Sequence, residues 1–113
     1  MGTIKKPKYI SHYLVLSDLL EGIDVRAKND AIFYHTSRIE NIKLNLAKRG
    51  ILFLENISKK SRYSTYKPYI LLPTSGNINK AKELLTQFNT DEVIEFLNEK
   101  NNVKFSYESK GSN

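Results

Sequence analysis

The sequence has no cysteine and no apolar run long enough to cross a lipid bilayer. Without cysteine the chain has no disulfides and no thiol chemistry, which fits a reducing compartment. The longest apolar runs, such as Ile51–Leu54 and Tyr69–Leu72, are far shorter than the roughly 20 residues of a spanning helix. No apolar stretch follows the N-terminal lysines, so no secretory signal is predicted. We expect a soluble cytoplasmic protein with no membrane partner.

The sequence patterns of catalysis and cofactor binding are also missing. No serine lies in a nucleophile elbow, no glycine-rich loop is built to cradle phosphate, and no pair of carboxylates is suggestively placed. His12 and His35 have no cysteine or acidic partner at metal-ligand spacing, so no metal site is predicted. We expect a protein that is not an enzyme and has no cofactor.

What the sequence does contain is enough apolar surface for one folded domain and an uneven distribution of charge. Its 113 residues are 40% hydrophobic, and a chain of this length buries about two thirds of its surface on folding. The net charge is +6, with fourteen Lys and Arg against six acids in residues 1–80 and four against six in residues 81–113. A basic body with a mildly acidic end favours a polyanionic partner for the body.

The spacing of apolar residues divides the first half of the chain into a series of helices. Residues 1–10 carry three lysines without periodicity and predict a flexible basic arm. From Ser11 the spacing is helical, and Gly22 stands where the helix should stop. Asp30–Tyr34 is predicted as a second, short helical segment. A longer helix then follows and ends at Gly50.

This longer helix has a distinct start and two different sides. Ser37 precedes Glu40 by three residues, the reciprocal arrangement that caps a helix, and Thr36 can share the cap. At 100° per residue, the apolar side consists of Ile39, Ile42, Leu46 and Ala47. The opposite side consists of Ser37, Asn41, Leu44, Asn45 and Lys48, with Arg38 on the border.

The next segment predicts a β-hairpin with a basic tip. The runs "ILFLENI" (51–57) and "TYKPYILL" (65–72) are rich in β-branched and aromatic residues, and "SKKSRYS" joins them. Pro68 has no amide to donate to a ladder, so the second strand should lie at an edge or start after it.

The last third of the sequence predicts two more helices. "PTSGN" (73–77) is predicted as a turn, and Ile78–Phe88 as an amphipathic helix. Thr90 can cap a further helix, Asp91–Lys100. Their apolar residues either fold back onto the domain or form a homodimer interface, and the sequence leaves both open.

This order predicts an α+β fold, a winged helix-turn-helix made of three helices plus a β-hairpin wing, with two additional C-terminal helices. The winged helix-turn-helix domain spans residues 11–74 and the helical extension residues 75–100, and a tail covers residues 101–113.

The stretch "NDAIFYHTSRIENIKLNLAKRGILFLENI" resembles the small winged helix-turn-helix domains common in bacteriophage genomes. Their pattern is a short alanine-bearing helix, a tight turn, a helix opened by Arg-Ile or Arg-Leu, and a close of the form Leu-Arg/Lys-x-Gly-hydrophobic before the wing. The matching positions are Ala31, Thr36, Arg38, Ile39, Ile42, Leu46, Lys48, Arg49, Gly50 and Ile51. The returning strand "RYSTYKPYIL" is also similar, and the resemblance covers roughly Tyr13–Leu72. His35 departs from it, because the family has a glycine or small residue in the turn.

The resemblance implies that the third helix enters the major groove of double-stranded DNA and that the wing touches the neighbouring backbone or minor groove. The residue types agree, since Arg pairs with guanine, Asn with adenine and Ser with either, while an exposed Leu can meet a thymine methyl. The predicted DNA-binding residues of the helix are Ser37, Arg38, Asn41, Leu44, Asn45 and Lys48. Those of the wing are Lys59, Lys60, Arg62, Tyr63 and Lys67.

We therefore expect a sequence-specific double-stranded DNA-binding protein, a transcriptional regulator of phage type in a bacterium or a phage-infected host cell. Two alternatives stay open. One is a winged-helix module that binds a host protein such as polymerase or a defence factor. The other is a DNA-binding accessory of replication or recombination that acts through architecture.

Overall fold

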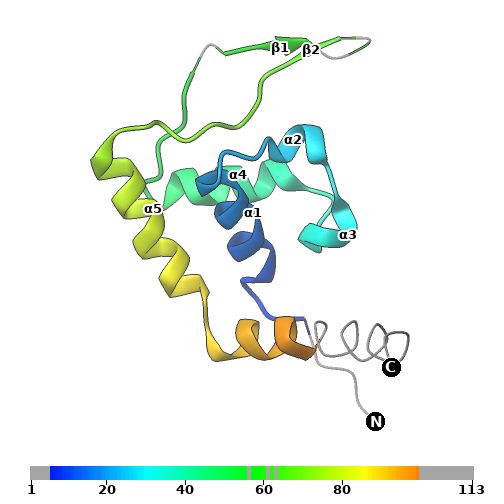
Figure 1. The fold of residues 1–113 in the computed structure, drawn as a ribbon, viewed down its shortest axis with the longest axis vertical. Coiled ribbons are helices and arrows are strands. Elements are labelled where there is room, and N and C mark those ends of the chain that lie inside the picture. Colours follow the sequence, from blue (N-terminus) through cyan, green and yellow to red (C-terminus); the bar gives the residue numbers. More distant parts are fainter. Residues whose placement is uncertain (1–5, 56, 61, 63, 100–113) are drawn as a thin grey trace, which may run out of the picture.

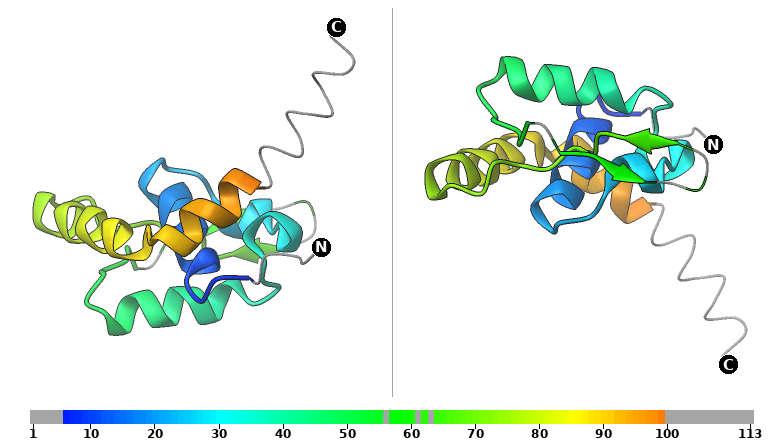
Figure 2. Two further views of the ribbon diagram at one scale, coloured as in Figure 1. Left: turned by 90° about the horizontal axis from the view of Figure 1, so that it is seen from below. Right: turned by 90° about the horizontal axis from the view of Figure 1, so that it is seen from above.

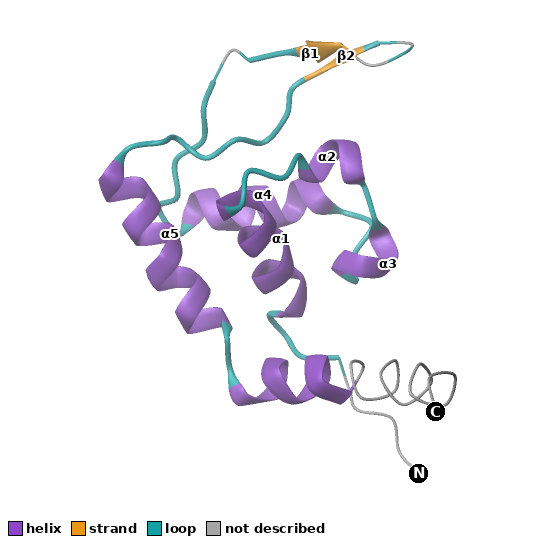
Figure 3. Cartoon of the chain, in the orientation of Figure 1, coloured by secondary structure: helices purple, strands orange, loops and turns teal. Residues whose placement is uncertain are grey.

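The computed structural model describes residues 6–55, 57–60, 62 and 64–99, and this part of the chain forms a small α+β fold. It consists of six helices and one antiparallel two-stranded hairpin (Figures 1 and 3). The sixth helix comprises residues 91–99 and carries no label. The other elements are α1 (Ile10–Leu20), α2 (Val25–Lys28), α3 (Ala31–Tyr34), α4 (Ile39–Lys48), β1 (Lys59–Lys60), β2 (Thr65–Tyr66) and α5 (Ser75–Phe88).

The first predicted helix is confirmed as α1, and the chain leaves it through Gly22 at a φ of +80°. Helix α2 was not predicted, because no helix was expected between the stop at Gly22 and the segment that begins at Asp30. It forms because the Asp24 carboxylate accepts a hydrogen bond from the amide of Ala27, which caps the helix start. The predicted short helix before the turn is confirmed as α3, capped in the same way by Asp30.

Helix α3 is held on α1 by a buried polar contact. The Tyr34 hydroxyl donates to the Asp18 carboxylate at 2.6 Å, and Lys28 Nζ donates to the same oxygen at 3.1 Å. Both Tyr34 and Asp18 are buried. Burial, followed by the hydrogen bond to Asp18, raises the pKa of Tyr34, so the phenol stays a proton donor. This contact fixes where the turn before α4 begins.

The turn between α3 and α4 differs from one expectation. His35 adopts a left-handed conformation with a φ of +58°, a geometry that glycine adopts at little cost. The capping box predicted for Ser37 and Glu40 does not form. The N-cap of α4 is Arg38, one residue later, and the Thr36 hydroxyl accepts its amide at 3.0 Å. With this shift neither Ser37 nor Glu40 stands at the position that capping requires.

The hairpin is paired in two places rather than along one continuous ladder. At its base, Phe53 bridges Leu71, and the backbones of both runs exchange hydrogen bonds of 2.8 and 3.0 Å. Farther out, β1 pairs with β2. Pro68 lies between the two paired regions, where a residue without an amide proton interrupts the ladder. The outer strand therefore precedes the proline, and in a two-stranded hairpin it lies at an edge, which is one of the two placements predicted from the sequence.

The core contains residues from α1, α4 and α5 together. Val15, Leu16, Leu46 and Ala81 are fully buried in one cluster, which Leu84 and Phe88 extend along α5. A second, smaller cluster joins Ile10 to Val93 and Phe96 of the last helix. Most apolar residues of both C-terminal helices thus pack against their own chain, which is one of the two readings left open by the sequence, whereas Ile94 is 41% exposed.

The predicted turn at residues 73–77 is instead the start of α5. Thr74 caps the helix by accepting the amide of Asn77 at 3.3 Å, so the helix begins at Ser75. At the other end of the fold, Lys6 Nζ donates to the His35 carbonyl at 2.7 Å and Pro7 is buried. The predicted tail at residues 101–113 and the first half of the predicted arm lie outside the described residues. Among the described residues, no helix has the length and apolar character needed to span a membrane.

Candidate nucleic-acid interface

The outward side of α4 is exposed in the described part of the chain. Helix α4 runs along one edge of the molecule in both views of Figure 2, with α1, α5 and residues 91–99 to one side of it. Its core side carries Ile39, Ile42 and Leu46, all buried. Leu44 on the outward side is 54% exposed although its side chain is apolar. Five of the predicted DNA-binding residues are exposed on this side: Ser37, Arg38, Asn41, Leu44 and Lys48.

Asn45, the sixth residue predicted on this helix, is in a different situation. It is half-buried, and its side-chain oxygen accepts a hydrogen bond from Arg49 Nε at 3.0 Å. Its acceptor is therefore occupied in the free protein. The geometry gives Asn45 a role in holding Arg49, which the sequence analysis did not predict.

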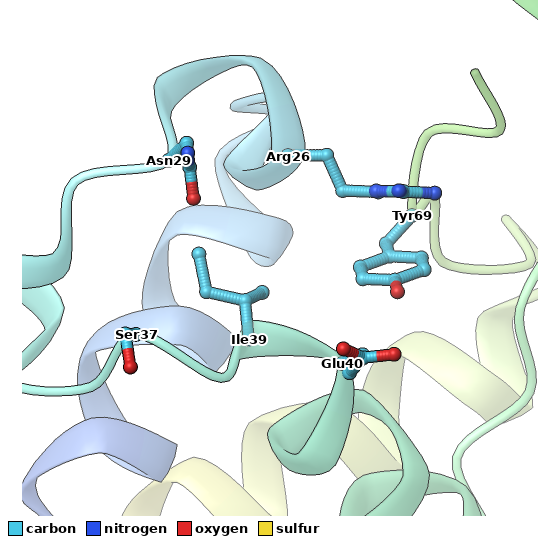
Figure 4. A pocket seen from close by; sticks show the side chains of 6 residues that line it. All are labelled: Arg26, Asn29, Ser37, Ile39, Glu40 and Tyr69. Carbon is cyan, nitrogen blue, oxygen red and sulfur yellow. The ribbon is translucent and has the colours of Figure 1, made fainter.

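A polar hollow of about 220 Å³ lies between α2, the turn and the start of α4 (Figure 4). We call it the α2–α4 hollow. In Figure 4 the Arg26 guanidinium lies across the Tyr69 ring, with the Glu40 carboxylate below. Glu40 is exposed and caps nothing, so it places one negative charge at the edge of the basic face. The residues lining the hollow are Arg26, Asn29, Ser37, Ile39, Glu40 and Tyr69.

The cations predicted on the wing are exposed but not equally available. Lys60, Arg62 and Lys67 are exposed. Lys59 is also exposed, yet its Nζ forms an ion pair with Asp24 at 3.2 Å. Tyr63, the remaining predicted wing residue, lies outside the described residues. Lys43 on α4 faces the base of the hairpin, with Nζ 5.2 Å from the Phe53 ring and 5.7 Å from the Tyr69 ring. The hairpin base therefore adjoins one flank of α4.

Two residues that the sequence analysis missed attach the hairpin to α2. The Asp24 carboxylate accepts hydrogen bonds from Tyr66 Oη at 2.8 Å and Lys59 Nζ at 3.2 Å, besides capping α2. Arg26 donates to the Lys67 carbonyl at 2.8 Å, and its guanidinium lies 5.1 Å from the centre of the Tyr69 ring. We call these contacts the α2–hairpin clasp.

The sequence carried one hint of the clasp, a capping-type aspartate before a short polar stretch, but its partners lie more than thirty residues away. The clasp sets the direction in which the hairpin extends. Its strands lie toward the same end of the molecule as the start of α4 (Figures 1 and 2).

The environment of Asp24 makes the clasp sensitive to acid. Burial alone would raise the pKa of Asp24, but the hydrogen bonds from Ala27, Tyr66 and Lys59 together outweigh burial and lower it. A carboxyl whose pKa is lower in the folded than in the unfolded chain stabilises the fold at any pH above its ordinary pKa. That contribution is lost as the pH falls below the ordinary value, which is near 4.

Asp24→Asn should therefore lower the free energy of unfolding at neutral pH by about 1–2 kcal/mol, because charge-assisted hydrogen bonds to the hairpin are lost. The difference from the unsubstituted protein should shrink below about pH 4, where Asp24 itself becomes protonated. Denaturant unfolding at several pH values measures both effects. Asp30→Asn is the matched control, because Asp30 caps α3 without touching the hairpin, and Asn caps as well as Asp. Equal losses in the two variants would contradict the clasp.

Comparison with known proteins gives no family assignment, since the chain matches no protein-family model, no curated protein and no solved structure. Within the described residues, no three acidic or histidine side chains lie close enough together to hold a metal ion. The exposed side of α4 and the hairpin are therefore the features from which a function can be inferred.

Proposed function

We propose that this protein is a winged helix-turn-helix protein that binds double-stranded DNA sequence-specifically, regulates transcription and catalyses no reaction. The observation that carries the proposal is the outward side of α4, which is polar and basic and covered by no other described part of the chain. The order of elements supports it, because three helical segments precede a hairpin and the third lies on the surface. Short α2 and α3 together occupy the place of the second helix in that order.

The proposed contacts follow from the exposed side chains. Arg38 and Asn41 lie at the start of α4, where a recognition helix meets base edges, and both can bond two base atoms at once. Leu44 is an apolar side chain with no partner in the core, and a thymine methyl is a matching contact. Phosphate contacts position the protein without specifying a sequence, and the cations suited to them are Lys48, Lys59, Lys60, Arg62 and Lys67.

The test is selection of bound sequences from a random duplex pool, followed by affinity measurements over a series of salt concentrations. We expect an enriched motif. We also expect the logarithm of affinity to fall with the logarithm of salt at a slope of roughly −4 to −5, as about five phosphate contacts require. Retention that depends on salt but enriches no motif would favour the architectural accessory instead.

A second candidate is supported by a different surface. On α3, Ile32 is 88% exposed and Phe33 is 42% exposed, an unusual position for two large apolar side chains. Such a pair would suit a protein partner, in line with a winged-helix module that binds a host protein. A chain that retains no duplex even at low salt would favour this candidate.

A further inference from the structure

Three of the cations that take part in no ion pair among the described residues lie close to one another. The ion pairs join Lys28 to Asp18 and Lys59 to Asp24, and none of them involves Lys8, Arg49 or Lys80. These three cations come from the chain before α1, the end of α4 and the middle of α5. Together with Tyr9 they form what we call the flank patch: Lys8, Tyr9, Arg49 and Lys80. Only Arg49 touches the DNA-binding residues predicted from the sequence.

Arg49 is held in one orientation before any ligand arrives. Its Nε donates to Asn45 at 3.0 Å, and its guanidinium lies 5.4 Å from the Tyr9 ring centre and 5.2 Å from that of Phe88. One terminal nitrogen reaches the Tyr9 hydroxyl at 3.5 Å. A guanidinium ordered in this way loses little side-chain entropy when it binds an oxyanion.

The neighbours of Arg49 extend the positive charge in two directions. Lys8 Nζ lies 5.4 Å from the centre of the Tyr9 ring. Lys80 covers Gly50 and shares with Arg49 a hollow of about 300 Å³, whose lining also includes Glu83. Glu83 is the one acid in that lining and forms no ion pair with either cation.

The pKa values of two neighbouring groups, Tyr9 and His12, are lowered in part by these cations. The hydrogen bond from Arg49, followed by the charge of Lys8, lowers the pKa of the Tyr9 phenol. Burial, followed by the charge of Arg49, lowers the pKa of His12. Both shifts agree with a patch whose cations lack acidic partners.

The flank patch and the hairpin lie on opposite flanks of α4. Lys43 faces the hairpin base, whereas Asn45 and Arg49 face Tyr9 and Phe88. In helical geometry residues 43 and 45 are 200° apart, with the outward residues Asn41, Leu44 and Lys48 between them. A duplex held against the outward side of α4 would thus present one backbone to the hairpin and the other to the flank patch.

We infer that the flank patch is a second binding surface for the phosphate backbone of DNA, on the flank of α4 opposite the hairpin. The inference rests on the proposed function, since it assigns a further surface to the same partner. Lys8, Arg49 and Lys80 each contact a phosphate oxygen, and Tyr9 and Asn45 keep Arg49 in position. Because phosphates carry no sequence, the patch contributes affinity but no base preference.

The test uses Lys8→Gln, Lys80→Gln and the double variant, with binding measured on a selected duplex and on a random one. Loss of two phosphate contacts should reduce the steepness of the salt dependence by about 2 and weaken both duplexes by the same factor. Arg49→Met keeps an apolar stem between the Tyr9 and Phe88 rings and should reduce the steepness of the salt dependence by about 1. Lys82→Gln is the control, because Lys82 is exposed on α5 and stands 200° around the helix from Lys80.

The outcomes separate the two proposals. A protein that binds no duplex overturns both. If duplex binding is retained and the double variant keeps the full salt dependence, the flank patch is excluded while the proposed function stands. If the Lys82 variant changes the slope as much as the Lys80 variant, the effect is one of general charge and the patch is likewise excluded.

Discussion

Replacing Asn77 with alanine is expected to lower the free energy of unfolding by about 2–4 kcal/mol, because three hydrogen bonds to the backbone of the hairpin base are lost. The Asn77 side chain is buried, and its oxygen accepts the Leu52 amide at 2.8 Å. Its nitrogen donates to the carbonyls of Leu52 and Leu72 at 2.8 and 2.9 Å. One amide group from α5 thereby joins both legs of the hairpin base.

Denaturant unfolding of the purified protein measures this loss. Asn79→Ala is the matched control, because Asn79 is exposed two residues farther along the same helix. Its replacement should change the free energy of unfolding by less than about 0.5 kcal/mol, as surface substitutions usually do. Asn77→Asp should also be destabilising, because a carboxylate keeps the acceptor but loses the donor for two carbonyls. An Asn77→Ala protein as stable as the control would show that the hairpin base does not need this contact.

The second large effect is expected in DNA recognition. Arg38→Ala and Asn41→Ala should each weaken the preference for the bases they contact by about 1–3 kcal/mol, because a bidentate pairing is lost. Both side chains are exposed and make no side-chain contact with the core, so the fold should be unaffected. Repeating the duplex selection with each variant measures the change as a flattened preference at individual positions.

Lys60→Ala is the comparison variant, because it separates loss of base preference from a general loss of DNA affinity. A phosphate contact on the hairpin should weaken binding to all sequences by a similar factor and reduce the steepness of the salt dependence by about 1. If the Arg38 and Asn41 variants behave like the Lys60 variant, α4 binds DNA without reading it. If none of the three changes retention on DNA, the protein-binding alternative is favoured.

Local sequence patterns predicted the helices well where one side of each helix is buried and a glycine stops it. Helices α1 and α4 both end where Gly22 and Gly50 take a positive φ, at 80° and 97°. The same patterns misplaced the start of α4, since Ser37 and Thr36 were both credible caps, whereas the N-cap is Arg38. For Pro68 the sequence allowed an edge strand or a strand that starts after it, and the structure has the edge strand, with Thr65 and Tyr66 paired before the proline.

The residues that position the candidate interface could not be predicted from the sequence, and the reason is the same for each of them. Asp24, Arg26 and Asn77 are polar residues in segments where no helix was predicted, and their partners are 25 to 42 residues distant. Nothing in the local spacing indicates which distant backbone group or side chain a polar residue will meet. Asn45 shows the same limit, because its position on the polar side of α4 gave no sign that Arg49 occupies its oxygen.

From periodicity, charge and stop residues alone, this chain could be assigned a basic α+β domain in which a helix with a polar side precedes a basic hairpin. Those properties arise between neighbours in sequence, so they are visible before folding. Only the tertiary structure decided which cations stay unpaired and which carboxylate holds the hairpin. It also decided that α5 completes the core. These outcomes depend on distances between residues far apart in sequence, because hydrogen bonds and ion pairs act over a few ångströms of space.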